Sequence, residues 1–524
     1  MATIPHLIEN AVKKFQNHEA VVDGNLRWTF KEYEQQIHSA TKAFMSKGIE
    51  HGDRIAIWAP NAAEWPVAAL GAHCAGAVLV PINTRFKGEE ANYILSRTSA
   101  KILFTVTDFL DTNYVDLLKD ASDQLDLEEI VVLRGSTPSN CTTWEEFISS
   151  GASVDETDRK TRSSEVADND LCHILFTSGT TGKPKGAMLE HAAVCRSYKT
   201  WCEVIGLTST DRYLVINPFF HTFGLNAGIL ACLMTGATLI PHPVFDVPSV
   251  MKRIPEEKIT MLPGAPTIYQ TILNHPELEN FDMSSLRLAV TGAAAIPVEM
   301  IYGMRERLGF ETVVTGYGLT EASGIATMCR HDDDPEIIAK TSGRAIDGVE
   351  VLVVDENGSE VQADEPGEIV IRGYNVMRGY LDDPEQTAET VDKDGWLHTG
   401  DIGVMDRNGY LDITDRKKDM IITGGFNVYP AEVENSLMSH PEIGQIAIVG
   451  APDERLGEIA VAFVVPAKQT APTEADLIIW ARERIANFKV PRQVIFVDHL
   501  PTNASGKVLK FELRESINSS KQVD

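Results

Sequence analysis

Residues 177–186 read TSGTTGKPKG and directly follow the apolar run CHILF at residues 172–176. Small residues allow backbone N–H groups to approach phosphate oxygens closely, hydroxyls add further donors, and lysine side chains neutralise negative charge. This loop contains all three. Its residue types therefore favour the binding of a phosphate chain, whereas a mobile linker of Gly and Thr would not follow a buried strand so closely.

The loop differs from the Walker loop of kinases and GTPases at two positions. The Walker motif requires a glycine five residues before Gly182, where this chain has Thr177. It also requires Ser or Thr after Lys183, where this chain has Pro184. The sequence therefore disfavours a nucleotide kinase of that type.

Apolar strands that could position this loop alternate with helices up to about residue 345. Such alternation favours an α/β fold in which a parallel sheet is covered on both faces. Several of these strands end in Gly or Pro, where open α/β sheets place their binding loops. The expected strands are residues 54–59, 77–82, 213–218, 237–242, 259–264 and 286–292.

Beyond residue 345 the pattern changes to short strands joined by acidic turns that contain Gly, which predicts a smaller β-rich subdomain. In the final hundred or so residues, strands again alternate with helices. One helix is expected to start at Pro430, and another to open with a capping box of Thr473 and Asp476. This part is expected to form a compact α+β unit.

Length and charge limit the possible partners. The chain has 524 residues, which at about 150 residues per domain predicts about three domains or subdomains. Its 47 basic and 75 acidic residues give a net charge of -28. A surface of that sign repels phosphate backbones and anionic lipid, so no nucleic-acid partner is expected.

Cysteine usage and apolar segments predict a cytoplasmic protein. The seven cysteines are scattered and form no CxxC pair, which is typical of reduced thiols in the cytosol. The first residues, MATIPHLIENAVKKF, lack the pattern of an export signal. The most apolar segment, residues 65–81, is too short for a membrane span and is interrupted by His73. No integral membrane segment is expected.

Four further motifs follow the loop along the chain. They are TGYGLTE (residues 315–321), WLHTGD (396–401), DRKKDMIITGGFNVYPAEVE (415–434) and PTNASGKVLK (501–510). With the loop, they resemble the five motifs of the adenylate-forming superfamily, in its order. This superfamily includes acyl-CoA synthetases, firefly-type luciferases and the adenylation domains of peptide synthetases, and the resemblance covers essentially the whole chain.

The resemblance implies a domain organisation. A large N-terminal adenylation domain, residues 1–417, would contain layered α/β subdomains and the β-rich subdomain. A small mobile α+β domain, residues 418–524, would rotate about a hinge at Lys418 between two half-reactions. A homodimer is an expectation of the family.

The resemblance also implies which residues bind ATP. The loop would close on the β- and γ-phosphates, with Thr180 and Glu321 as oxygen ligands of Mg²⁺. Tyr317 would stack on adenine, and Asp401 would accept both ribose hydroxyls. The full expected set for ATP or AMP is Thr177, Ser178, Gly179, Thr180, Thr181, Gly182, Lys183, Lys185, Ala293, Ala294, Tyr317, Gly318, Thr320, Asp401, Arg416 and Lys507.

Lys507 is the residue expected to carry the chemistry. When a carboxylate attacks the α-phosphate of ATP, two anions meet, and a lysine between them neutralises the growing charge. Thr180, Glu321 and His221 are the other residues implied as catalytic. Because these groups act by charge and position, no covalent protein intermediate is expected.

The second half-reaction needs an acceptor for the acyl adenylate. The stretch IITGGFNVYP resembles the lining of a pantetheine tunnel, where Gly424 and Gly425 leave room for the thiol arm of CoA. Only 17 residues follow Lys507, so no attached carrier domain is expected. CoA is the expected acceptor, and nothing in the sequence indicates the oxygen chemistry of a luciferase.

The acyl pocket is expected near residues 217–228 and 291–296 and beside Gly316. It is apolar and has no evident acid to pair with a substrate ammonium, which favours a hydrophobic carboxylic acid over an amino acid. Stretches such as INPFFHTFG resemble the bacterial ligases that activate the ring propanoate left by steroid degradation. The implied lining residues are His221, Phe223, Asn226, Gly292 and Gly316.

Other interpretations stay open at this point. Fatty acids of medium or long chain and aryl or cinnamate-type acids are alternative substrates, and Asn226 lies where the sequence departs from the ring-propanoate ligases. A different class would be a non-catalytic sensor of acyl-CoA or nucleotide. The presence of Glu321, Asp401 and Lys507 disfavours that class.

Overall fold

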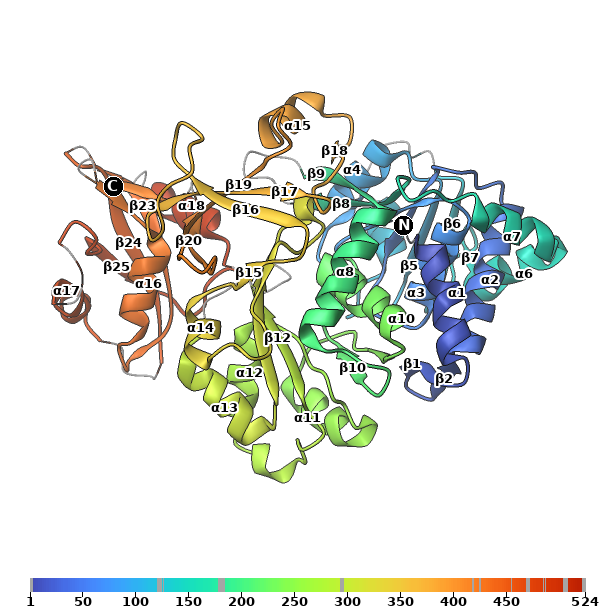
Figure 1. Ribbon diagram of the computed structural model, residues 1–524, viewed down its shortest axis with the longest axis horizontal. Helices are drawn as coiled ribbons and strands as arrows, with labels where there is room; N and C mark the ends of the chain where they lie inside the picture. Colours follow the sequence, from blue (N-terminus) through green and yellow to red (C-terminus); the bar gives the residue numbers. More distant parts are fainter. Residues whose placement is uncertain are drawn as a thin grey trace. The chain divides into compact units, whose positions relative to one another are not determined.

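The computed structural model divides the chain into two compact units (Figure 1). The first is Met1–Val351 with Ile371–Leu397, and the second is Leu352–Val370 with His398–Asp524. The structure describes residues 3–119, 125, 127–177, 184–292, 296–416, 419–423, 426–453, 455–467, 472–483, 485, 487–502 and 508–520.

An eight-stranded sheet in the first unit carries both ends of the loop at residues 177–186. This loop is called the phosphate loop because it is expected to bind phosphates. The order of the sheet is β18-β9-β8-β4-β3-β5-β6-β7, with β8 to β7 parallel and with β9 and β18 each antiparallel to its neighbour. The parallel, apolar strands confirm the expected α/β class. The bounds are β3 (Arg54–Trp58), β4 (Val78–Pro81), β5 (Ile102–Val106), β6 (Glu129–Arg134), β7 (Thr142–Thr143), β8 (Leu171–Thr177), β9 (Lys185–Glu190) and β18 (Gly379–Tyr380).

Two four-stranded sheets complete the strand layers of the first unit. One has the order β10-β11-β1-β2 and the other the order β12-β13-β14-β15. Their bounds are β1 (Glu19–Asp23), β2 (Leu26–Thr29), β10 (Arg212–Val215), β11 (Thr238–Pro241), β12 (Leu288–Gly292), β13 (Thr312–Tyr317), β14 (Thr327–Met328) and β15 (Arg344–Ala345).

Helices pack on these sheets, and α2 contacts α3 and α6 (Figure 1). Helix α2 begins with a capping box of Thr29 and Glu32, and α3 is buried at every residue after Glu64, which fits its largely apolar sequence. The helices are α1 (Ile4–Phe15), α2 (Phe30–Ser46), α3 (Glu64–Cys74), α4 (Gly88–Thr98), α5 (Tyr114–Lys119), α6 (Trp144–Ser150), α7 (Glu156–Ser164), α8 (His191–Ile205), α9 (Thr222–Gly224), α10 (Ala231–Thr235), α11 (Val247–Glu257), α12 (Pro266–Leu273), α13 (Val298–Leu308), α14 (Pro335–Lys340) and α15 (Pro384–Thr390).

The second unit contains most of the β-rich part as well as the α+β part, whereas the β-rich part was expected within the N-terminal domain, residues 1–417. Strands β16 (Val349–Val354), β17 (Pro366–Gly373), β19 (Leu397–Met405) and β20 (Leu411–Arg416) form one sheet, in that order. A five-stranded sheet has the order β22-β21-β24-β23, with β25 beside β24. Its elements are β21 (Ile421–Thr423), β22 (Phe426–Val428), β23 (Ile443–Asp453), β24 (Gly457–Pro466), β25 (Gln493–Phe496), α16 (Pro430–Met438), α17 (Glu474–Arg482) and α18 (Lys510–Ser520).

Two helix starts expected from the sequence are confirmed in this unit. Helix α16 begins at Pro430, where the fixed φ of proline suits the first helical position. Helix α17 follows the capping box of Thr473 and Asp476, whose side chains and backbone N–H groups bond reciprocally. Local sequence signals therefore set both boundaries.

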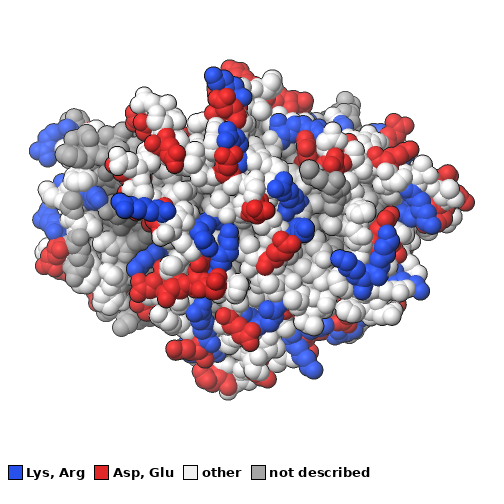
Figure 2. Space-filling view, viewed as in Figure 1, with Lys and Arg blue, Asp and Glu red and all other residues white. Residues whose placement is uncertain are grey.

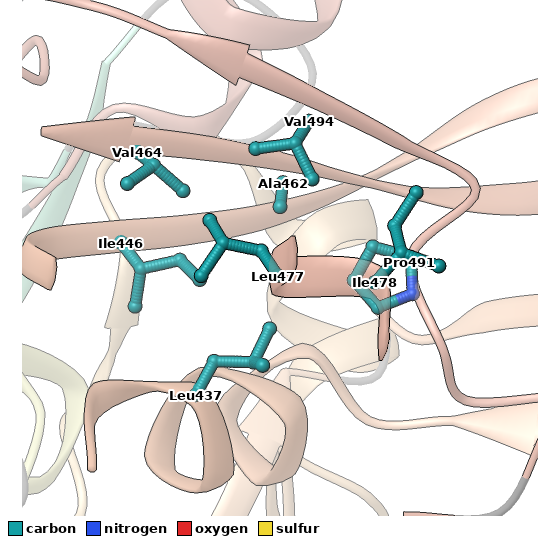
Figure 3. Close-up of a pocket in the computed structure, with 8 residues that line it drawn as sticks. All are labelled: Leu437, Ile446, Ala462, Val464, Leu477, Ile478, Pro491 and Val494. Atoms are coloured by element: carbon teal, nitrogen blue, oxygen red, sulfur yellow. The ribbon is translucent and has the colours of Figure 1, made fainter. Parts of the chain in front are cut away.

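A small pocket in the second unit belongs to its hydrophobic core. Only apolar residues line it, and it has no space for a water molecule. Figure 3 shows the lining side chains, which are Leu437, Ile446, Ala462, Val464, Leu477, Ile478, Pro491 and Val494. The pocket is a packing gap between α16, α17 and the sheet, and it offers no polar group for a ligand.

The surface carries charges of both signs. On the face that Figure 2 shows, described Lys and Arg side chains are interspersed with Asp and Glu rather than gathered in one basic patch. Among the described helices, none is both long enough and apolar enough to cross a membrane.

Candidate active site

Strands β8 and β9 are antiparallel neighbours, and residues 178–183, which are expected to bind phosphate, connect them along the chain. Thr177 ends β8, Lys185 begins β9, and these two residues are cross-strand partners. Strand β8 is buried over most of its length, which fixes both ends of the loop at the sheet. Ser178, Gly179, Thr180, Thr181, Gly182 and Lys183 lie outside the described residues.

Glu321 lies next to the first residue of that loop. It sits in a single helical turn, η4 (Thr320–Ala322), and is 9% exposed. The Thr177 hydroxyl donates to Glu321 Oε1 at 3.3 Å, and the Tyr380 hydroxyl donates to the same oxygen at 2.8 Å. The structure therefore brings two expected site residues, 144 positions apart, into contact and adds a third that the motifs did not indicate.

Lys185 is held at the base of the loop. Its Nζ donates to Gln386 Oε1 and lies 5.5 Å from the centre of the Tyr380 ring. A cavity of about 200 Å³ adjoins this lysine. The cavity is lined by Tyr93, Arg97, Phe176, Pro184, Lys185, Gly186, Tyr380, Leu381 and Asp383.

The expected adenine-binding residue Tyr317 and two expected acyl-pocket residues, Gly292 and Gly316, lie at the carboxyl ends of two parallel strands. Gly292 of β12 pairs with Gly316 of β13, and Tyr317 ends β13. A Cβ atom on Gly318 would lie 2.4 Å from the backbone of Gly324 and Ile325, so only glycine fits there. Ala293 and Ala294 lie outside the described residues.

The other expected acyl-pocket residues, His221, Phe223 and Asn226, follow β10. His221 is exposed, and its Nδ1 accepts a hydrogen bond from the Phe223 N–H at 3.2 Å. Asn226 lies in a π-helical turn, residues 225–230, and is fully buried. Within the described part of the chain, neither its Oδ1 nor its Nδ2 has a hydrogen-bond partner.

The expected ribose-binding residues lie in the second unit. Asp401 on β19 is 5% exposed, and its cross-strand partner on β20 is Arg416. The Asp401 N–H donates to Thr399 Oγ1 at 3.1 Å, and that hydroxyl donates to the Ile369 carbonyl at 2.7 Å. These bonds fix the backbone that carries the Asp401 carboxylate.

Several expected residues of the second unit fall outside the described ones. Lys418, Gly424, Gly425 and Lys507 are in this group. Strands β21 and β22 pair on either side of residues 424 and 425, and Thr502 and Val508, which flank residues 503–507, form an antiparallel bridge.

Mixed α/β sheets with a small α+β part at the C-terminus match the fold of the adenylate-forming superfamily. The family of AMP-binding enzymes matches residues 8–381, and that of the AMP-binding enzyme C-terminal domain matches residues 432–507. The chain therefore belongs to the AMP-binding enzyme family, as its motifs predicted.

Individual relatives extend over nearly the whole chain. A 3-[(3aS,4S,7aS)-7a-methyl-1,5-dioxo-octahydro-1H-inden-4-yl]propanoyl:CoA ligase of Rhodococcus jostii (strain RHA1) is 48% identical and covers 98% of both chains. A ligase of the same name from Mycobacterium tuberculosis (strain ATCC 25618 / H37Rv) is 46% identical and covers 98% of this chain and 99% of its own.

A solved structure agrees with the fold. The anthranilate CoA ligase AuaEII in complex with anthranoyl-AMP superposes with a TM-score of 0.88 at 28% identity. The match covers 99% of this chain and 98% of that one.

Proposed function

We propose that the protein is an ATP-dependent acid:CoA ligase that works through an acyl adenylate. In the first step, a carboxylate oxygen attacks the α-phosphorus of ATP, and the bond to pyrophosphate breaks. In the second step, the CoA sulfur attacks the acyl carbon and AMP leaves. The observation that carries the proposal is the contact between Thr177, at the start of the loop, and Glu321, because a carboxylate at this loop could hold Mg²⁺ beside the phosphates of ATP.

Mg²⁺ fits the described part of this site. It is a hard ion that prefers oxygen ligands, and Glu321 presents a carboxylate to which described residues donate only at Oε1. Glu321 and Thr180 would hold the ion. When bound, Mg²⁺ supplies positive charge that offsets the charge of the phosphates.

The protein's own residues would divide the remaining work. The loop residues bind the β- and γ-phosphates, Tyr317 orients the adenine, and Asp401 fixes the ribose. Lys507 stabilises the charge that develops between carboxylate and α-phosphate. Gly424 and Gly425 would then line the path of the CoA thiol.

For the acid, we propose a hydrophobic ring propanoate of the kind that steroid degradation produces. Two relatives are named as ligases of a bicyclic ring propanoate, and the segment around Phe223 and Asn226 is largely buried and apolar. Fatty acids of medium or long chain and aryl acids are the alternatives. We also propose that the protein is cytoplasmic and forms a homodimer. The described cysteines form no disulfide, which is consistent with a reducing compartment.

Pyrophosphate release from ATP with a panel of acids tests the proposed substrate class. The panel holds steroid ring propanoates, C6 to C18 fatty acids, cinnamates and benzoates, each with and without CoA. The ring propanoates are expected to give the highest kcat/KM and a product that contains CoA. A higher kcat/KM for a fatty or aryl acid would overturn the substrate class but leave the ligase chemistry standing.

A further inference from the structure

The segment from Asn375 to Tyr380 supports the turn that carries Glu321. The Asn375 Nδ2 donates to the Ile325 carbonyl at 2.8 Å, and the Ser323 hydroxyl donates to the Asn375 carbonyl at 2.8 Å. Asn375 is completely buried. The Met377 N–H donates to the Glu321 carbonyl at 2.7 Å. Backbone and side chains of this segment therefore fix the position of the turn.

The same segment is also bonded to the strand that follows the phosphate loop. Tyr380 of β18 pairs with Ala187 of β9. On either side, the Arg378 N–H donates to the Met188 carbonyl at 2.9 Å and the Leu381 N–H donates to the Gly186 carbonyl at 2.8 Å. Residues 375–381 thus connect the strand behind the loop with the turn of Glu321.

The Tyr380 side chain completes this connection at the carboxylate itself. Its hydroxyl lies 2.8 Å from Glu321 Oε1, and the residue is 8% exposed. A phenol is protonated at neutral pH, so the Tyr380 hydroxyl donates to this carboxylate oxygen. With Thr177 as the second donor, Oε1 is occupied, and no described residue donates to Oε2.

We propose that Tyr380 is a positioning residue for the metal site: it holds Glu321 Oε1 so that Oε2 faces the Mg²⁺ of bound ATP. This inference rests on the proposed role of Glu321 as a magnesium ligand. Residues that orient a ligand carboxylate are needed for metal affinity, because a carboxylate that rotates loses its preorganised geometry.

Tyr380→Phe removes only the hydroxyl. It is expected to raise the half-saturating Mg²⁺ concentration for pyrophosphate release by about 10- to 100-fold, the usual effect of removing a group that orients a metal ligand. Calorimetric titration with a non-hydrolysable ATP analogue, with and without Mg²⁺, is expected to show that the variant loses the metal-dependent gain in affinity. The reaction of added acyl-AMP with CoA is expected to be unchanged, since it needs no pyrophosphate site.

Tyr114→Phe is the matched control. The Tyr114 hydroxyl also donates at 2.8 Å from a buried ring, but to the Thr84 carbonyl, so its loss is expected to leave the Mg²⁺ dependence unchanged. Combining Tyr380→Phe with Glu321→Gln tests whether Tyr380 acts through Glu321. No further change in Mg²⁺ dependence is expected in that background, because coupled residues are not additive.

The outcomes separate this inference from the proposed function. If Glu321→Gln raises the half-saturating Mg²⁺ concentration and Tyr380→Phe does not, the positioning role of Tyr380 is wrong and the proposed function stands. If neither variant changes it, Glu321 is not a magnesium ligand, and the inference fails together with the proposed magnesium site while the ligase function stands. Should Tyr380→Phe not fold, Tyr380→Met removes the same hydroxyl, and an unchanged Mg²⁺ dependence in that variant would overturn the inference.

Discussion

An enzyme in which Lys507 is replaced by alanine is expected to release pyrophosphate about 100- to 1,000-fold more slowly than the wild type. The physical reason is charge. The attacking carboxylate and the α-phosphate are both anions, and without the lysine their repulsion rises as they approach. Single-turnover release of pyrophosphate from ATP, with saturating acid, measures this step directly.

The second half-reaction serves as the internal control for Lys507→Ala. Acyl-AMP added from outside is expected to react with CoA at close to the wild-type rate, because no α-phosphate is attacked in that step. Lys252→Ala removes a lysine whose side chain is 69% exposed on α11 and is expected to change neither step. If Lys507→Ala released pyrophosphate normally, Lys507 would have no role in adenylation.

Asp401→Ala is expected to lower kcat/KM for ATP by about 10- to 100-fold for each ribose hydroxyl that loses its charged acceptor. The effect should fall on kcat/KM for ATP rather than on the reaction of added acyl-AMP. The buried position of Asp401 and the fixed backbone at Thr399 favour a strong, directional contact.

Deoxygenated nucleotides test the Asp401 contact atom by atom. The wild type is expected to prefer ATP over 2′-deoxy-ATP by about 10-fold or more, and Asp401→Ala is expected to lose that preference. A cycle that changes the protein (Asp401→Ala) and the nucleotide (2′-deoxy-ATP) singly and together isolates the energy of this one contact. A variant that still discriminates between the two nucleotides would show that another residue binds the 2′-hydroxyl.

The sequence predicted those parts of the fold that depend on local signals. Apolar strands that alternate with helices indicated a parallel sheet, and Pro430 and Thr473 marked two helix starts. The end of β8 at Thr177 placed the phosphate loop, because a buried strand followed by small residues is readable from the chain alone. The five motifs then gave the family, which the family match confirmed.

The role of Tyr380 could not be read in the same way. Its position depends on the pairing of β18 with β9, which joins residues nearly two hundred positions apart, and no local pattern specifies that register. A tyrosine after a glycine, shortly before Pro384, reads as a turn. Only the contact with Glu321 distinguishes Tyr380 from an ordinary turn residue. In the same way, only the bond to Gln386 shows how Lys185 is held at the base of the loop.

The most direct test of the proposed acyl adenylate follows one oxygen atom of the acid. The enzyme is incubated with ATP, Mg²⁺, CoA and a ring propanoate whose carboxylate carries ¹⁸O, and the products are analysed by mass spectrometry. Formation of an acyl adenylate predicts acyl-CoA and AMP in equal amounts, with one ¹⁸O atom in the phosphate of AMP. Label in inorganic phosphate, with ADP in place of AMP, would contradict adenylation and with it the proposed function.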